Sequence, residues 1–186
     1  MARRHDPERR QRIIDAAIRV VAAHGIGGLS HRAVAAEADV PLGSTTYHFA
    51  GRDDLLVAAL RQLNEGWLAG LASWERSYDP GRSLAAELTR LVEEYLTMGP
   101  ARLRLEYELY LAALRHPPLR PLAAEFVDAV TATLGRHTPD QRTARALTGL
   151  IDGLLLQSVV TGRPLDRAEL RAALERFLDP GPDPAP

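Results

Sequence analysis

The sequence contains no cysteine and no lysine, and it has no long uninterrupted apolar run. Without cysteine, the chain can form no disulfide, no thiol nucleophile and no thiolate metal site. Its most apolar stretch, which ends near Val160, is interrupted by Asp152 and Gln157 and is shorter than the roughly 20 residues that cross a bilayer. The arginines near the start are not followed by the apolar segment of a secretory signal. These absences predict a cytoplasmic protein that does not enter a membrane.

The sequence also lacks the patterns of common catalytic sites. It has no glycine-rich phosphate loop, no nucleophile with a base at a known spacing and no cluster of metal ligands. The spacing of His24, His31 and His48 matches no common zinc site. The pair Glu93 and Glu94 is interpreted as part of a solvated face rather than as an acid–base pair. We therefore expect no enzymatic activity, no cofactor and no bound metal.

Charge is distributed unevenly between the two ends of the chain. Residues 1–52 contain 8 arginines and 5 acidic residues, a net charge of +3, whereas residues 53–186 contain 15 arginines and 19 acidic residues, a net charge of −4. A basic N-terminal part attached to an acidic remainder is typical of a protein whose N-terminal part contacts an anion.

Apolar residues recur at helical spacing along most of the chain, and no segment shows the sustained alternation of a half-buried strand. The first predicted helix covers about residues 7–23 and has one apolar stripe formed by Ile14, Ala17, Ile18 and Val21. Similar stripes follow between breaks rich in glycine and proline. The pattern predicts an all-α fold of about nine helices.

Residues that begin and end helices support this division. Ser30, Ser83 and Asp166 are expected N-caps. Thr138 begins a predicted capping box that places Pro139 in the first helical position. The proline-rich segment 179–186 is expected to be a disordered tail.

Two short predicted helices, separated by residues 39–41 and preceded by an amphipathic helix, form a helix-turn-helix pattern. In this motif the second helix lies in the major groove of DNA. Here it carries hydroxyl side chains at residues 44–46, which can bond to base edges or phosphates, and Gly43, which allows close approach to the backbone. Arg3 and Arg4 can extend along the duplex as an arm. The motif predicts double-stranded DNA as a partner.

Residues 29–49, LSHRAVAAEADVPLGSTTYHF, and the following RDDLL at residues 52–56 resemble the DNA-binding signature of the tetracycline-repressor (TetR) family. The resemblance is strong over about residues 9–60, and residues 107–115 resemble a C-terminal subtype common among actinobacterial members. It implies a three-helix helix-turn-helix DNA-binding domain at residues 1–52. It also implies a larger helical bundle for ligand sensing and dimerisation at residues 53–178.

Members of this family typically act as dimers that bind a near-palindromic operator, and a small molecule usually releases the DNA. The resemblance implies that Phe49 packs the DNA-binding domain against the next helix. Thr46 stands where many members have tyrosine, Ala50 where many have lysine, and Asp39 where the turn usually has glycine; aspartate tolerates a left-handed turn. The residues expected to contact DNA are Ser30, Arg32, Gly43, Ser44, Thr45, Thr46, Tyr47, His48 and Arg52.

The larger domain provides two further sets of candidates. Large, mostly aromatic side chains on the inner stripes of its helices can either fill the core or line a pocket for a mostly apolar effector of unknown identity. They are Trp67, Tyr95, Met98, Tyr107, Tyr110 and Phe126. Residues on the last two helices are predicted to form the homodimer interface, and they are Leu147, Ile151, Leu154, Leu155, Ser158, Leu170, Leu174 and Phe177.

The function predicted from the sequence is a repressor that is released from its operator by a small molecule. An alternative uses the same DNA-binding domain without a small-molecule effector. In that case a protein partner or the abundance of the regulator controls transcription.

Overall fold

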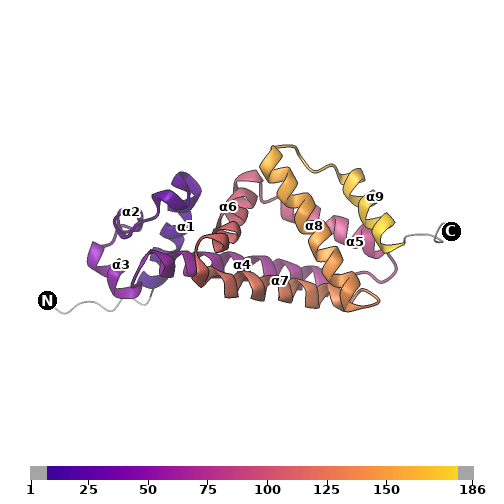
Figure 1. Ribbon diagram of the computed structural model, residues 1–186, viewed down its shortest axis with the longest axis horizontal. Coiled ribbons are helices and arrows are strands. Elements are labelled where there is room, and N and C mark those ends of the chain that lie inside the picture. Colours follow the sequence, from indigo (N-terminus) through magenta and orange to yellow (C-terminus); the bar gives the residue numbers. More distant parts are fainter. Residues whose placement is uncertain (1–7, 180–186) are drawn as a thin grey trace. The chain divides into compact units, whose positions relative to one another are not determined.

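The computed structural model describes residues 8–179, and all regular secondary structure in this range is helical (Figure 1). The basic residues 1–7, with the predicted arm, and residues 180–186 of the predicted tail lie outside the described residues. The described range confirms the expected all-α fold. Its nine α-helices are α1 (Arg9–Gly28), α2 (His31–Glu37), α3 (Leu42–His48), α4 (Arg52–Arg76), α5 (Leu84–Leu96), α6 (Pro100–Leu111), α7 (Arg120–Gly135), α8 (Gln141–Thr161) and α9 (Arg167–Leu178), with two 3₁₀ turns, η1 (Ala112–Leu114) and η2 (Pro117–Leu119).

The chain forms two compact units. The first comprises Met1–Glu65 and Arg104–Ala124, and the second comprises Gly66–Leu103 and Glu125–Pro186. Helices α4, α6 and α7 therefore contribute residues to both units. The division of binding functions at residue 52 stays a prediction.

The core of the first unit is built from apolar stripes on α1, α4 and α6. Ile13 and Val21 of α1, Leu56 of α4 and Leu109 of α6 are each fully buried in one cluster. Phe49 is buried in the same cluster, as the family resemblance implied. Burying side chains of this size stabilises the fold by about 1.5–3 kcal/mol each.

Local backbone geometry sets the ends of the short helices. The Ser30 hydroxyl accepts a hydrogen bond from the N–H of Ala33 and caps α2, as predicted. Asp39 has a φ of 51°, the left-handed turn that the sequence predicted there. Gly25 has φ 68° and ψ 175°, so the regular part of α1 ends there and a short helical turn follows.

In the second unit, α9 packs against α5 and α8. Asp166 caps α9 through the N–H of Glu169, as predicted. The predicted capping box at the start of α8 is wrong. Asp140 is the N-cap, its carboxylate accepts from the N–H of Thr143 at 2.8 Å, and Pro139 lies outside the helix. Thr138 and Asp140 are both favourable N-cap residues and lie only two positions apart, so the sequence alone did not decide between them.

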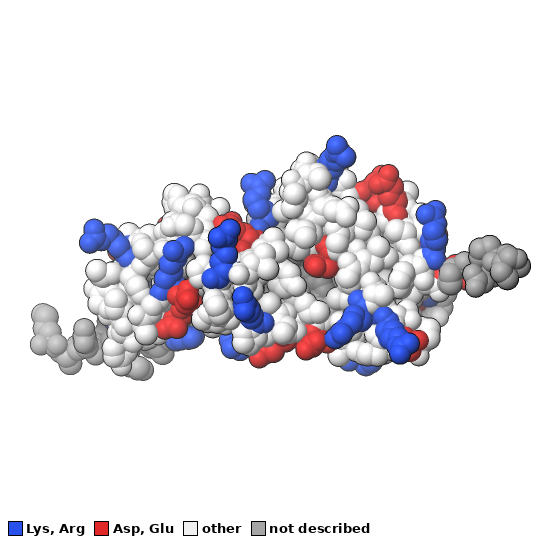
Figure 2. Space-filling view, viewed as in Figure 1, with Lys and Arg blue, Asp and Glu red and all other residues white. Residues whose placement is uncertain are grey.

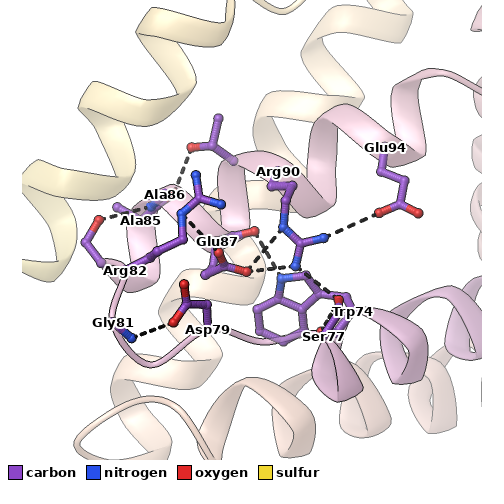
Figure 3. A network of polar contacts seen from close by, with 12 residues as sticks. Trp74, Ser77, Asp79, Gly81, Arg82, Ala85, Ala86, Glu87, Arg90 and Glu94 are labelled. Atoms are coloured by element: carbon purple, nitrogen blue, oxygen red, sulfur yellow. Dashed lines mark hydrogen bonds and ion pairs between the residues drawn. The ribbon is translucent and has the colours of Figure 1, made fainter.

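A buried carboxylate joins the end of α4 to the start of α5 (Figure 3). Glu87 is 1% exposed, and its Oε2 accepts from Arg90 at 2.7 Å while Oε1 lies 3.5 Å from the Nε of Arg82. The indole Nε1 of Trp74 donates to the Glu87 carbonyl at 3.0 Å. Arg90 also donates to Ser77 at 3.2 Å. The buried charge is paired with both arginines and is hydrogen-bonded through Oε2 alone, and this network links the end of α4 to the 77–83 connection.

Candidate nucleic-acid interface

Helix α3 presents a continuous exposed surface in the first unit. Gly43 and Thr46 are exposed, and Ser44 and His48 are half-buried. Leu42 is 46% exposed and Tyr47 is 79% exposed. A large side chain this exposed contributes little to the core, which fits a surface that contacts a partner.

Thr45 lies on the opposite side of α3. It is fully buried, and its hydroxyl donates to the Leu42 carbonyl at 2.8 Å. The expectation that Thr45 contacts DNA is therefore wrong. Its side chain is buried, and its hydroxyl donates within the helix instead of reaching a duplex. Sequence analysis could not separate it from Ser44 and Thr46, because all three are hydroxyl residues in one short helix.

Arg52, another expected DNA contact, has a partner inside the protein. Its guanidinium donates to the Ile26 carbonyl at the end of α1. Arg32 is exposed on α2, and Ser30 is exposed while its hydroxyl caps that helix. Leu42 was not among the residues predicted to contact DNA, because an apolar residue at the start of a helix is ordinarily expected in the core. Only the structure shows that its side chain is exposed.

A surface groove of about 330 Å³ lies beside α3 and is lined by residues of α1, α3 and α4 that include Arg10, His48 and Arg61. The Arg10 guanidinium lies 5.3 Å from the centre of the Phe49 ring, a cation–π distance. On the face drawn in Figure 2, arginine and acidic side chains are interspersed rather than gathered into one patch.

The candidate ligand residues form separate groups. Trp67, Tyr95 and Phe126 form an edge-to-face cluster in the second unit, with ring centres 5.9 Å and 5.2 Å from Trp67. Tyr107 and Tyr110 are 6.5 Å apart on α6 in the first unit. The sixth candidate, Met98, is 51% exposed in the turn that follows α5.

Several predicted dimer residues are interior residues of the protomer. Leu147, Leu155, Leu170 and Leu174 are at most 5% exposed within the second unit, so they are core residues and are not available to a second copy. The half-buried residues of the predicted set are Ile151, Leu154, Ser158 and Phe177. Ser158 also donates to the Arg163 carbonyl at 2.8 Å. The periodicity of α8 could not separate these groups, because the helix is apolar on most sides.

One acidic side chain in the first unit has a strongly altered acidity. Burial raises the pKa of Glu106 on α6 from 4.5 to about 7, because a low-dielectric surrounding disfavours the carboxylate. Sequence analysis missed this residue, since a glutamate in a helix is ordinarily exposed.

Two family profiles match the chain. Residues 13–59 match bacterial regulatory proteins of the tetR family, and residues 79–180 match the tetracycline repressor-like C-terminal domain. The chain belongs to the TetR family. Its sequence is 29% identical over 180 residues to the HTH-type transcriptional regulator BetI of Paraburkholderia phytofirmans, and the match covers 89% of each chain. This TetR-family chain is therefore a transcriptional regulator and not an enzyme.

Two solved structures have the same fold. The multidrug binding protein EbrR complexed with ethidium is 58% identical, with a TM-score of 0.83 over 93% of this chain and 99% of that chain. A TetR-family member from Streptomyces coelicolor is 57% identical, with a TM-score of 0.84 over 92% of this chain and 99% of that one. No helix in the described part of the chain is long and apolar enough to span a membrane.

Proposed function

We propose that this TetR-family regulator represses transcription as a homodimer on a near-palindromic operator and is released by an aromatic cation. The observation that carries the effector class is the set of crystal structures of EbrR with ethidium, proflavin and malachite green, at 56–58% identity. All three dyes are aromatic cations. A site for such dyes needs aromatic side chains, because the negative face of an aromatic ring attracts a cation.

The cluster of Trp67, Tyr95 and Phe126 supports this effector class. The three rings belong to α4, α5 and α7 within one unit, and all three are half-buried. Side chains that are neither fully packed nor fully exposed can contact a ligand without first leaving a core. Tyr107, Tyr110 and Met98 remain further candidates.

The first test measures dye binding without DNA. Titration of the dimer with malachite green by calorimetry should give saturable binding, and Trp67→Leu should weaken it by about tenfold or more, since a lost cation–π contact in a desolvated site contributes about 2 kcal/mol. Tyr47→Leu is the matched control, because it removes an exposed aromatic ring on α3 and should leave dye affinity unchanged. Equal affinity of the parent and Trp67→Leu would remove the aromatic cluster from the site.

The second test measures release of DNA, using fragments retained from the source genome at fixed salt. The dyes also bind DNA, so the parent is compared with Trp67→Leu on the same fragment. We expect release of the parent at a dye concentration that leaves the variant bound. Release of both would show that the dye acts through the DNA. Dye binding with no release of the parent would favour control by a protein partner or by abundance.

In this proposal residues 1–52 bind DNA, and the surface of α3 enters the major groove. The proposed contacts keep Gly43, Ser44, Thr46, Tyr47 and His48 on α3, with Ser30 and Arg32 at the start of α2. We add Leu42 to these proposed contacts, because it is 46% exposed and its methyl groups can contact a thymine methyl.

Residues 53–178 bind the effector and the second copy. The proposed dimer surface lies on α8, where Val160 is 73% exposed and a Cβ added at Gly149 or Gly153 would meet nothing within 4 Å. Such a surface lets a second helix approach closely. Leu154→Arg should therefore convert the dimer to a monomer in sedimentation at about micromolar concentration, and one DNA-binding domain alone should bind an operator far more weakly. A parent protein that sediments as a monomer would exclude the symmetric-operator proposal.

A further inference from the structure

The backbone of one residue at the end of α1, Ile26, is held from two other helices. The N–H of Ile26 donates to Oε1 of Glu108 on α6 at 2.7 Å, across 82 positions of sequence. The carbonyl of Ile26 accepts from the Arg52 guanidinium at the start of α4. All three residues belong to the first unit.

The backbone at Gly25 is shaped to admit the Glu108 carboxylate. Its φ of 68° interrupts α1 and frees the N–H of Ile26, so Glu108 acts as the N-cap of the turn that follows. A Cβ at Gly25 would lie only 3.0 Å from the same Oε1. Glycine is thus required at position 25 for two reasons, the positive φ and the close approach of the Glu108 carboxylate.

The clamped residue, Ile26, lies immediately before the DNA-reading helices. Leu29 is 2% exposed, and Ser30 caps α2 through the N–H of Ala33. Only three residues separate Ile26 from that cap, so the direction in which α2 begins depends on the position of the clamp. A neighbouring hydrogen bond, between Asp53 Oδ1 and His116 Nδ1 at 2.8 Å, joins the same end of α4 to the segment after α6.

We propose that Glu108 is a positioning residue for DNA binding: with Arg52 it fixes the α1–α2 junction and thereby orients α3 toward the duplex. This assigns Arg52 to the clamp rather than to a phosphate. The inference rests on the DNA-binding function of the family and is independent of the identity of any effector.

The salt dependence of DNA affinity separates the two roles of Arg52. Loss of a phosphate contact lowers the slope of log affinity against log salt by about 0.9 for each protomer, because fewer counterions are released. Loss of a positioning contact lowers the affinity and leaves the slope unchanged. We expect Arg52→Ala to behave in the second way, and a reduced slope would return Arg52 to the phosphate contacts.

Glu108 is tested in the full-length protein by fluorescence anisotropy on a DNA fragment retained from the genome. Glu108→Ala should weaken binding by about tenfold or more, the effect expected of a lost hydrogen bond to a charged group, with an unchanged salt slope. Glu108→Gln, which keeps an acceptor oxygen, should restore most of the affinity. Glu125→Ala, which removes an exposed carboxylate on α7, is the control and should bind as the parent does.

Concentrations of active protein are measured by titration with excess DNA, so partial unfolding does not count as weak binding. The combination of Glu108→Ala with Arg52→Ala should weaken binding by less than the product of the separate effects, because both remove one clamp. Gly25→Ala, which displaces the carboxylate without removing it, should weaken binding even if Glu108→Ala does not fold. Parent-like affinity of folded Glu108→Ala or Gly25→Ala would overturn the proposal.

Discussion

The raised pKa of Glu106 predicts that removing its charge stabilises the protein in a pH-dependent way. The pKa of Glu106 is about 7 in the folded chain against an ordinary value of 4.5, so the folded state binds more protons than the unfolded state between these values. Stability contributed by this group is therefore complete below about pH 4.5 and is lost as pH rises to about 7. Glu106→Gln replaces the carboxyl with a neutral group of the same shape and should avoid this loss.

The size of the effect follows from the difference between the two pKa values. At about 1.36 kcal/mol for each pH unit the difference corresponds to about 3 kcal/mol. Glu106 is half-buried rather than fully buried, and solvent screening reduces the expected gain to about 2 kcal/mol at pH 8. At pH 5 the carboxyl is mostly protonated in the folded state, and the gain should fall to about 0.5 kcal/mol.

Urea unfolding, followed by the helical circular dichroism signal, measures the stability gain of Glu106→Gln at pH 8 and at pH 5. Protein concentration must be equal across samples, because association stabilises the folded state by mass action. Glu125→Gln, an exposed site on α7, is the control and should show no gain that grows with pH. A gain for Glu106→Gln that is equal at both pH values, or a loss at pH 8, would refute burial as the cause of the raised pKa.

Three further predictions concern single side chains. Glu87→Ala should lower the free energy of unfolding by about 2–3 kcal/mol in urea titrations, because it removes the buried carboxylate and leaves Arg90 only the exposed carboxylate of Glu94 at 3.8 Å; an unchanged midpoint would mean that the network in Figure 3 adds no net stability. Asp39→Gly should raise the free energy of unfolding, measured by thermal denaturation, by roughly 0.5–1 kcal/mol. Asp39 has a φ of 51°, a backbone conformation that glycine adopts without strain. A lower free energy of unfolding would show that the aspartate side chain supports the turn. Thr46→Ala should weaken DNA binding at unchanged thermal stability. Thr45→Ala should instead lower thermal stability, because Thr45 is fully buried. If Thr45→Ala weakened DNA binding and Thr46→Ala lowered stability, α3 would face DNA through its other side.

The sequence by itself determined the features that arise within a few residues of chain. The N-caps Ser30 and Asp166 each bond to an N–H three residues away, and the left-handed turn at Asp39 is likewise local. Helical periodicity, turn residues and caps are readable because each depends on neighbours in sequence. The helix-turn-helix signature adds a specific arrangement of such local features, and it was sufficient to indicate the family.

Only the tertiary structure decided which face of each helix is used and which charges meet. Periodicity marks an apolar stripe on α8 but does not show that Leu147 and Leu155 are buried within the protomer while Leu154 is not. The partners of Ile26 lie 26 and 82 positions away, and Glu106 differs from an ordinary glutamate only through its burial. Such contacts depend on how helices pack across long stretches of chain, and no local pattern records that packing.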